Sequence, residues 1–122
     1  MTEITTEKQS CREQSRATIN RYLRDYRRTY SLMKSTALTR KYLDDASFND
    51  DSAETVYRAK MFEIRAFVLS IDQTPEKMLL YYYYIKGFTL EKCAQILGIS
   101  RRSVYRLKIK ALDLALEKYL ET

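Results

Sequence analysis

Apolar residues recur at helical spacing along two long stretches in the first half of the chain. One set is Ile19, Leu23, Tyr26, Tyr30 and Met33, and the other is Tyr57, Met61, Ile64, Val68 and Ile71. Steps that alternate between four and three residues place each set on one side of a helix. We therefore predict a first helix from about Arg12 to Lys34 and a second helix that begins near Ser52.

The segments around these two helices predict connections. Residues 38–43 favour a shorter helical piece, and residues 44–52 are rich in Asp, Ser and Asn, which favour a loop. Residues 1 to about 10 are polar, and we expect them to fray. Two seams of equal length joined by a loop suit an antiparallel hairpin, although an intermolecular coiled coil uses the same pattern. Five seam positions make a short zipper, so we favour the hairpin.

A third helical segment begins beside the single proline. Thr74 is a candidate N-cap, and Pro75 suits the first helical position because its missing N–H has no helical partner there. Gly87 is placed to end the segment. The run Tyr81–Tyr84 covers most of a helix circumference, because each residue turns the helix by about 100°. One neighbour cannot bury all of these rings, so we expect at least one of Tyr81 and Tyr84 to be exposed.

The segment 89–110 has the pattern of a helix-turn-helix. Thr89 is placed to cap a first helix, Gly98 to end it in a left-handed conformation, and Ser100 to cap a second helix. The residues predicted to fill the space between the two helices are Leu90, Cys93, Ala94, Leu97, Ile99, Val104 and Leu107.

The second helix of this motif is longer than the motif needs, since its pattern continues from Arg101 to about Leu120. One apolar stripe, toward the motif core, contains Val104, Leu107, Ala111 and Leu114. A second stripe contains Tyr105, Ile109, Leu112, Leu116 and Tyr119. The C-terminal half of the second stripe needs cover, either from the N-terminal hairpin or from a second subunit. A homodimer therefore stays an alternative.

Helix-favouring residues dominate the composition, and the chain holds two glycines and one proline. The fold class we predict is all-α. An N-terminal helical region over residues 1–72 and a helix-turn-helix region over residues 73–122 are expected to pack as one compact unit. The net charge of +6 indicates an acidic partner, of which nucleic acid is the most common.

A second basic segment lies in the first long helix. Between residues 16 and 41 one acid, Asp25, stands among eight cations: Arg16, Arg21, Arg24, Arg27, Arg28, Lys34, Arg40 and Lys41. An acidic block without a cation follows, formed by Asp44, Asp45, Asp50, Asp51 and Glu54. The basic segment either forms a solvated face that pairs with this block or contacts phosphates, and the sequence leaves both readings open.

The composition gives little support to chemistry other than binding. The chain has no histidine and two cysteines, of which Cys93 falls on an apolar helix side and favours a small buried side chain. There is no glycine-rich phosphate loop, paired-carboxylate pattern or metal-ligand spacing, so we predict no enzyme activity, no cofactor and no metal. No apolar run reaches the roughly 20 residues that span a bilayer, and no signal peptide pattern occurs. These features favour a cytoplasmic location without a membrane partner.

Residues 75–116 resemble region 4 of bacterial sigma factors. The resemblance rests on Pro75-Glu76, on Gly87-Phe88-Thr89 and on residues 94–100, which read A-Q-I-L-G-I-S. The phrase S-V-Y-R-L-K-I-K-A-L, residues 103–112, is similar to phage late-gene transcription regulators of the ArpU/RinA type. Those are small basic proteins from phages of Gram-positive bacteria. Since no sigma region 2 is recognisable, the chain does not resemble a free-standing sigma factor.

The resemblance implies that the helix beginning at Arg101 reads the major groove of double-stranded DNA. The implied reading surface is Arg101, Arg102, Tyr105 and Arg106. The side chains implied to contact phosphates are Lys92, Lys108 and Lys110, and those implied to make hydroxyl or backbone contacts at helix starts are Thr89, Ser100 and Ser103.

The function that follows is a sequence-specific transcription regulator, an activator of phage late genes at the nucleoid of a bacterial host. Its N-terminal helices are expected to dock DNA, a second subunit or RNA polymerase. The alternatives are a small terminase subunit, which packages DNA, and a sigma-like adaptor of RNA polymerase.

Overall fold

Every element in the described part of the chain is helical, which confirms the predicted all-α class. The computed structural model describes residues 2–43 and 51–121. The elements are α1 (Thr2–Leu43), α2 (Asp51–Leu69), α3 (Thr74–Leu80), the π-helical turn η2 (Tyr81–Ile85), α4 (Leu90–Leu97) and α5 (Arg101–Glu121). Among these residues, no helix is both long enough and apolar enough to cross a membrane.

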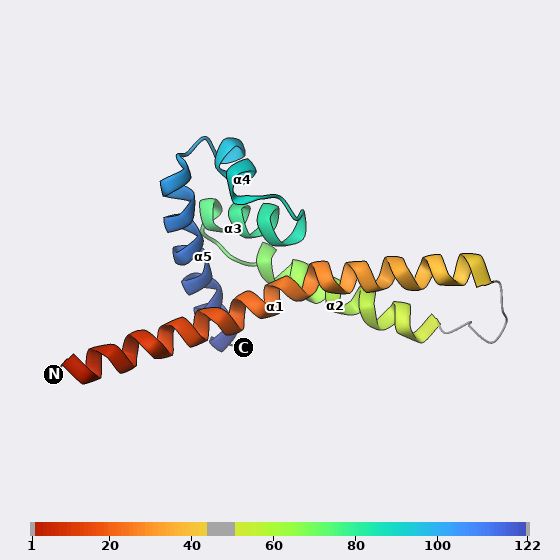
Figure 1. Cartoon of the computed structure of the whole chain (residues 1–122), viewed down its shortest axis with the longest axis horizontal. Coiled ribbons are helices and arrows are strands. Elements are labelled where there is room, and N and C mark those ends of the chain that lie inside the picture. The colour runs from red at the N-terminus through yellow and green to blue at the C-terminus, as the bar shows by residue number, and fades with distance from the viewer. Residues whose placement is uncertain (1, 44–50, 122) are drawn as a thin grey trace.

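α1 is one continuous helix along the long axis of the molecule (Figure 1). The prediction of a separate piece over residues 38–43 is wrong, and the helix already begins at Thr2, within the stretch that was expected to fray. Residues 2–43 contain neither glycine nor proline, so nothing interrupts the backbone hydrogen bonds of the helix. Hydroxyl residues within it bond to the preceding turn, as the Thr39 hydroxyl does when it donates to the Ser35 carbonyl at 2.8 Å.

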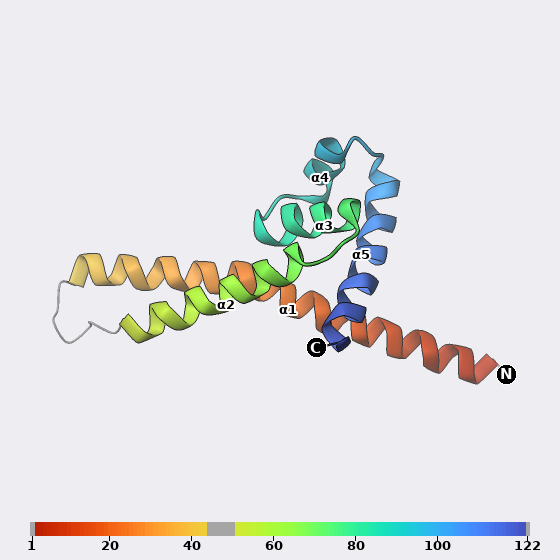
Figure 2. The same cartoon turned by 180° about the vertical axis from the view of Figure 1, so that it is seen from behind.

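α2 lies antiparallel to the C-terminal half of α1, as the front and back views show (Figures 1 and 2). It begins at Asp51, one residue before the predicted start. The predicted loop lies largely outside the described residues, and so do Asp44, Asp45 and Asp50 of the acidic block. The buried seam residues are Ile19, Leu23 and Tyr26 from α1, and Ile64, Val68 and Ile71 from the second seam. The predicted intrachain hairpin is confirmed.

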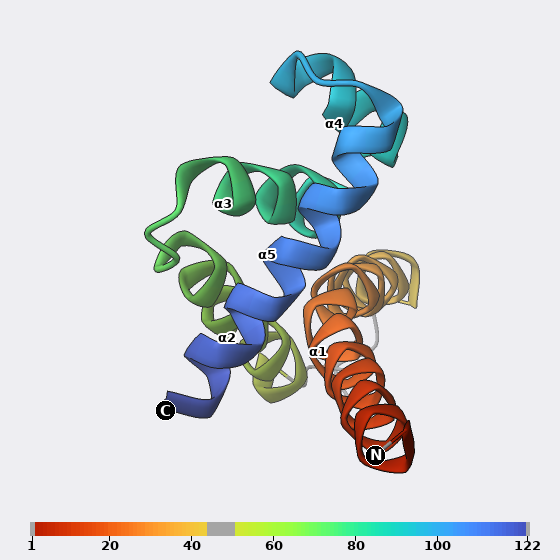
Figure 3. The same cartoon turned by 90° about the vertical axis from the view of Figure 1, so that its left-hand side faces the viewer.

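The hairpin also covers the C-terminal half of the second stripe of α5, which runs across α1 (Figure 3). Tyr119 packs its ring against Tyr22 of α1 at 5.3 Å and against Phe67 of α2 at 6.3 Å, measured between centroids. Leu112 and Leu116 join the same core. The cover that the sequence left open therefore comes from the chain itself.

Small side chains let α5 approach the hairpin closely. Ala111 and Ala115 are fully buried in the core that α5 shares with α1 and α2. The stripe predicted to face the motif core includes Ala111, which lies in this core instead, and does not include Ala115. Beside them the Arg16 guanidinium donates to both carboxylate oxygens of Asp113, at 2.6 and 3.1 Å. This cation of the basic segment is thus tied to α5.

The start of α3 differs from its prediction. Thr74 is the first helical residue, and Gln73 occupies the N-cap position without a side-chain hydrogen bond. The first turn closes through the backbone, because the Lys77 N–H donates to the Gln73 carbonyl at 2.9 Å. The predicted side-chain cap at Thr74 is wrong, whereas Pro75 does lie in the first turn.

The four tyrosines do not form part of a regular α-helix. They lie in η2, whose wider turn changes the direction of each side chain. Tyr84 is only 2% exposed, its hydroxyl donates to the side-chain oxygen of Asn20 in α1, and burial raises its pKa well above the usual range. Tyr81 is half-buried. The expectation that Tyr81 or Tyr84 would be exposed is therefore wrong, because α1 covers this side of η2.

Candidate nucleic-acid interface

The capping residues and the glycine of the helix-turn-helix have the roles that the sequence predicts. The Lys92 N–H donates to the Thr89 hydroxyl at 3.2 Å and caps α4. The Ser103 N–H donates to the Ser100 hydroxyl at 3.1 Å and satisfies an open donor at the start of α5. Gly98 ends α4 with a φ of 68°, a left-handed conformation that glycine adopts without strain.

A small apolar core sets the angle between the motif helices. Its buried members are Leu79, Cys93, Ala94 and Val104, and the partly buried residues around them include Leu90, Leu97, Ile99 and Leu107. Every position predicted to fill this space lies there. Cys93 has the predicted role of a small buried side chain, and burial raises the pKa of its thiol.

The N-terminal turns of α5 carry the predicted reading surface, and all of its side chains are exposed. Arg102 and Arg106 share one helix face, and no carboxylate pairs with either in the described part of the chain. Arg101 and Tyr105 share the adjacent face, where Tyr105 is 53% exposed. Arg101 forms an ion pair with Glu91 of α4. The fold thus brings the four predicted side chains to one end of the molecule.

The predicted lysines lie in different surroundings. Lys92 and Lys108 each lie over an aromatic ring, with 4.2 and 4.9 Å between the ammonium nitrogen and the ring centroid. The Lys110 ammonium lies 3.3 Å from a carboxylate oxygen of Glu76, whose side chain is only 5% exposed. Lys110 therefore neutralises a buried carboxylate, a role that the sequence did not indicate.

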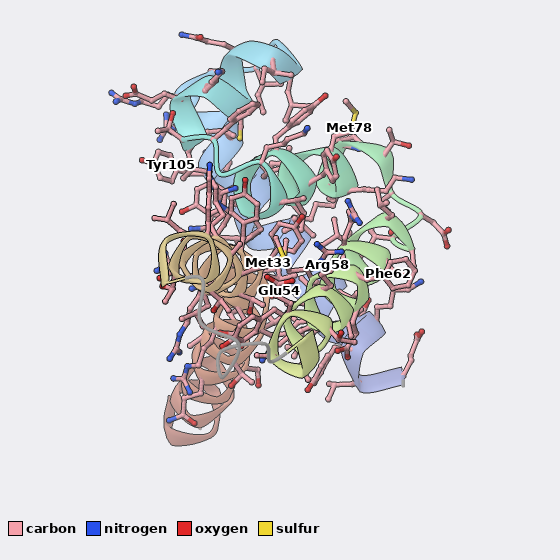
Figure 4. All side chains as sticks on the ribbon, turned by 90° about the vertical axis from the view of Figure 1, so that its right-hand side faces the viewer. Met33, Glu54, Arg58, Phe62, Met78 and Tyr105 are labelled. Atoms are coloured by element: carbon pink, nitrogen blue, oxygen red, sulfur yellow. The ribbon has the colours of Figure 1, made fainter. Side chains whose placement is uncertain are left out.

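A groove of about 590 Å³ separates the helix-turn-helix from α1. Two of the predicted site residues, Thr89 and Tyr105, line it, and Arg24 and Arg27 of α1 line it from the other side. Figure 4 shows Tyr105 above α1. The three-residue spacing of the arginines places them on one helix face, but the sequence could not show that this face meets the motif. That placement depends on how α5 crosses α1.

Comparison with known families agrees with this geometry. Residues 74–114 match the family model of sigma-70, region 4, which spans α3, η2, α4 and most of α5. No curated protein and no solved structure matches the chain significantly. The segment 74–114 is therefore a helix-turn-helix of the sigma-70 region 4 type, a class of DNA-binding domain.

Proposed function

We propose that the protein is a sequence-specific DNA-binding transcription regulator that reads the major groove with the first turns of α5. The match of residues 74–114 to sigma-70 region 4 carries this proposal, and the exposed cations at the start of α5 support it. Arginine can donate two hydrogen bonds to the guanine edge, so Arg102 and Arg106 supply sequence discrimination. Arg101 joins them by leaving Glu91, which costs little because an exposed ion pair is worth about 0–1 kcal/mol.

The other predicted site residues position the duplex and do not read it. Phosphate and sugar contacts fix register, whereas base edges carry the sequence. The positioning residues in this proposal are Thr89, Lys92, Ser100, Ser103, Lys108 and Lys110. Lys92 and Lys108 lose less conformational entropy when they bind a phosphate, because the aromatic rings beneath them already restrict their side chains.

The regulated genes in this proposal are phage late genes, and the protein activates them at the nucleoid, in the cytoplasm of a bacterial host. The similarity of residues 103–112 to regulators of the ArpU/RinA type supports this step. No enzymatic step is part of the proposal. The proposal does include a protein partner, because two large apolar side chains are exposed on one side of α2. These are Phe62 and Leu69, which are 67% and 52% exposed. RNA polymerase and a second copy of the chain are the two candidate partners.

Selection of binding sites from random duplex DNA tests the reading surface. The double variant Arg101→Ala/Arg102→Ala should lose about 1–3 kcal/mol of discrimination for each arginine that pairs with a guanine. Its circular dichroism should stay helical. The matched control is Arg58→Ala/Arg65→Ala, which removes two exposed cations from α2 and should leave discrimination unchanged. A reading-surface variant that still separates the selected duplex from a scrambled one would refute the assigned face.

Two further measurements separate this function from its alternatives. Light scattering should show a monomer or dimer, whereas assembly into a ring would indicate a DNA-packaging subunit. Transcription from a template that carries the selected site should rise only when the polymerase also holds its own sigma factor. Transcription without any host sigma factor would indicate a sigma-like adaptor.

A further inference from the structure

The basic face of α1 and the DNA-reading end of α5 border the same groove. Arg24 and Arg27 are exposed on α1, and they face a wall that includes Thr89 and Tyr105. Tyr105 belongs to the predicted reading surface, so the groove opens beside the proposed reading face. Phosphate strands flank a helix that enters the major groove, so a basic groove beside the start of α5 is on a side where such a strand would run.

The Arg27 guanidinium is held in place at this groove. Its Nη1 donates to the Ile85 carbonyl at 3.4 Å, and its Cζ lies 5.0 Å from the centre of the Tyr30 ring. Gly87 leaves room for it, because a Cβ atom at that position would lie 3.0 Å from the Arg27 Nε. A guanidinium fixed in this way loses less conformational freedom when it binds an anion.

The positive charge of the groove is not consumed by the protein. Neither Arg24 nor Arg27 pairs with a carboxylate in the described part of the chain. Among the described residues, Glu91 is the one acid that lines the groove, and it pairs with Arg101. Two arginines in an open groove with one internally neutralised acid attract an anionic partner, and Arg is suited to phosphate because its donors match two oxygens.

We infer that Arg24 and Arg27 bind backbone phosphates of the same duplex that α5 reads. The inference rests on the proposed function, and it extends the DNA interface beyond the sigma-70 region 4 segment to α1. These arginines add affinity without adding sequence preference, because phosphates are alike at every base pair. Because α1 also contacts the duplex, the hairpin of α1 and α2 has one fixed orientation on the DNA.

The salt dependence of binding tests this inference with matched variants. Arg24→Gln/Arg27→Gln is compared with Arg58→Gln/Arg65→Gln, which removes the same charge from α2 (Arg58 lies well away from Tyr105 in Figure 4). Binding is measured on the selected duplex and on a scrambled duplex of equal length. The slope of log affinity against log salt should become shallower by about 1.8 for the α1 pair, since each lost phosphate contact removes about 0.9. It should stay unchanged for the α2 pair.

The affinity ratio between the two duplexes gives the second readout. It should be the same for the α1 pair as for the natural sequence, whereas Arg101→Ala/Arg102→Ala should reduce it. Unchanged slopes in the α1 pair, or equal losses in the α1 and α2 pairs, would overturn the inference. A normal ratio in Arg101→Ala/Arg102→Ala would overturn the proposed reading face instead, so the two failures are distinguishable.

Single variants guard against a folding defect at Arg27, which packs on Gly87. Arg24→Gln removes a side chain without a hydrogen bond or ion pair in the described part of the chain, and the slope should still become shallower by about 0.9. Arg27→Lys keeps the charge and should keep the natural slope. An Arg24→Gln protein with the natural slope would count against phosphate binding at this position.

Discussion

Two pairs of helices in this chain are built in different ways. α4 and α5 meet across a turn of three residues, and the short side chains of Cys93 and Ala94 let them pack closely. α1 and α2 are long helices held by large apolar side chains, such as Leu23 and Ile64, along a shared seam. The geometry of the first pair depends on residues close in sequence. The geometry of the second depends on contacts between residues far apart.

The difference shows how the reading end is attached to the rest of the molecule. α5 belongs to both structures, because Val104 lies in the core of the helix-turn-helix and Ala111 in the core of the hairpin. A helix that is fixed in two cores transmits the position of one to the other. We expect the regions 1–72 and 73–122 to unfold together for this reason.

The largest effect is expected at the hairpin core. Leu23 is fully buried where α1 meets the other helices, and Leu23→Ala should lower the free energy of unfolding by about 2–5 kcal/mol. Native-state hydrogen exchange then measures how far this loss spreads. Amides of α4, which lies in the other core, should exchange faster by the same factor as those of α2. Protection of α4 that does not change would show two independent regions.

Val56→Ala is the control for this comparison. Val56 is on α2 and is 63% exposed, so its truncation should change the free energy of unfolding by no more than about 0.5 kcal/mol.

The two left-handed glycines offer a smaller and sharper comparison. Gly98 lies in the turn of the motif, where a Cβ would meet nothing within 4 Å. Gly98→Ala should therefore lower the free energy of unfolding only by the cost of a left-handed alanine, about 1–2 kcal/mol. Gly87 has the same handedness, but there a Cβ would crowd Arg27 of α1. Gly87→Ala should therefore lower the free energy of unfolding, measured by chemical denaturation, by more than Gly98→Ala does. Equal losses would mean that the contact between Gly87 and Arg27 carries no constraint.

These glycines also mark what the sequence can predict. Both were identified as helix ends, and the caps at Thr89 and Ser100 were predicted correctly, because such signals act over a few residues. The seam positions followed from helical period alone. The side-chain cap predicted at Thr74 failed although it is a local signal. The π-helical turn that directs Tyr84 onto α1 was not predictable from propensity, because it depends on long-range packing.

The candidate site divides in the same way. Exposure of Arg102 and Arg106 follows from their position in the motif, so the sequence could predict it. The groove with Arg24 and Arg27 could not be predicted, because it exists only through the crossing of α5 over α1. The pairing of Lys110 with Glu76 likewise joins two elements whose approach no local pattern records.

That ion pair gives the next prediction. Lys110→Met keeps most of the aliphatic chain but leaves the buried Glu76 carboxylate without its cation. The loss in free energy of unfolding should be about 1 kcal/mol or less, because the Lys110 side chain is 69% exposed and water screens the pair. In a Glu76→Gln background the same change should have almost no effect on stability. A loss of equal size in both backgrounds would exclude the pair as its cause.

The smallest effect at neutral pH is expected at Tyr22, where the two regions meet. Its ring contacts Phe67 of α2 and Tyr119 of α5, and burial, with the neighbouring charge of Glu63, raises its pKa to about 12. An unfolded tyrosine has a pKa of about 10, so above that pH the unfolded chain releases a proton that the folded chain keeps. The contribution of Tyr22 to the free energy of unfolding is therefore fully present below a pH of about 10 and is lost as the pH rises towards 12.

Tyr22→Phe cannot ionise, so its free energy of unfolding should decline less steeply over this pH range in urea titrations. If both proteins decline with the same slope, the ionisation of Tyr22 does not weaken the junction between the hairpin and α5.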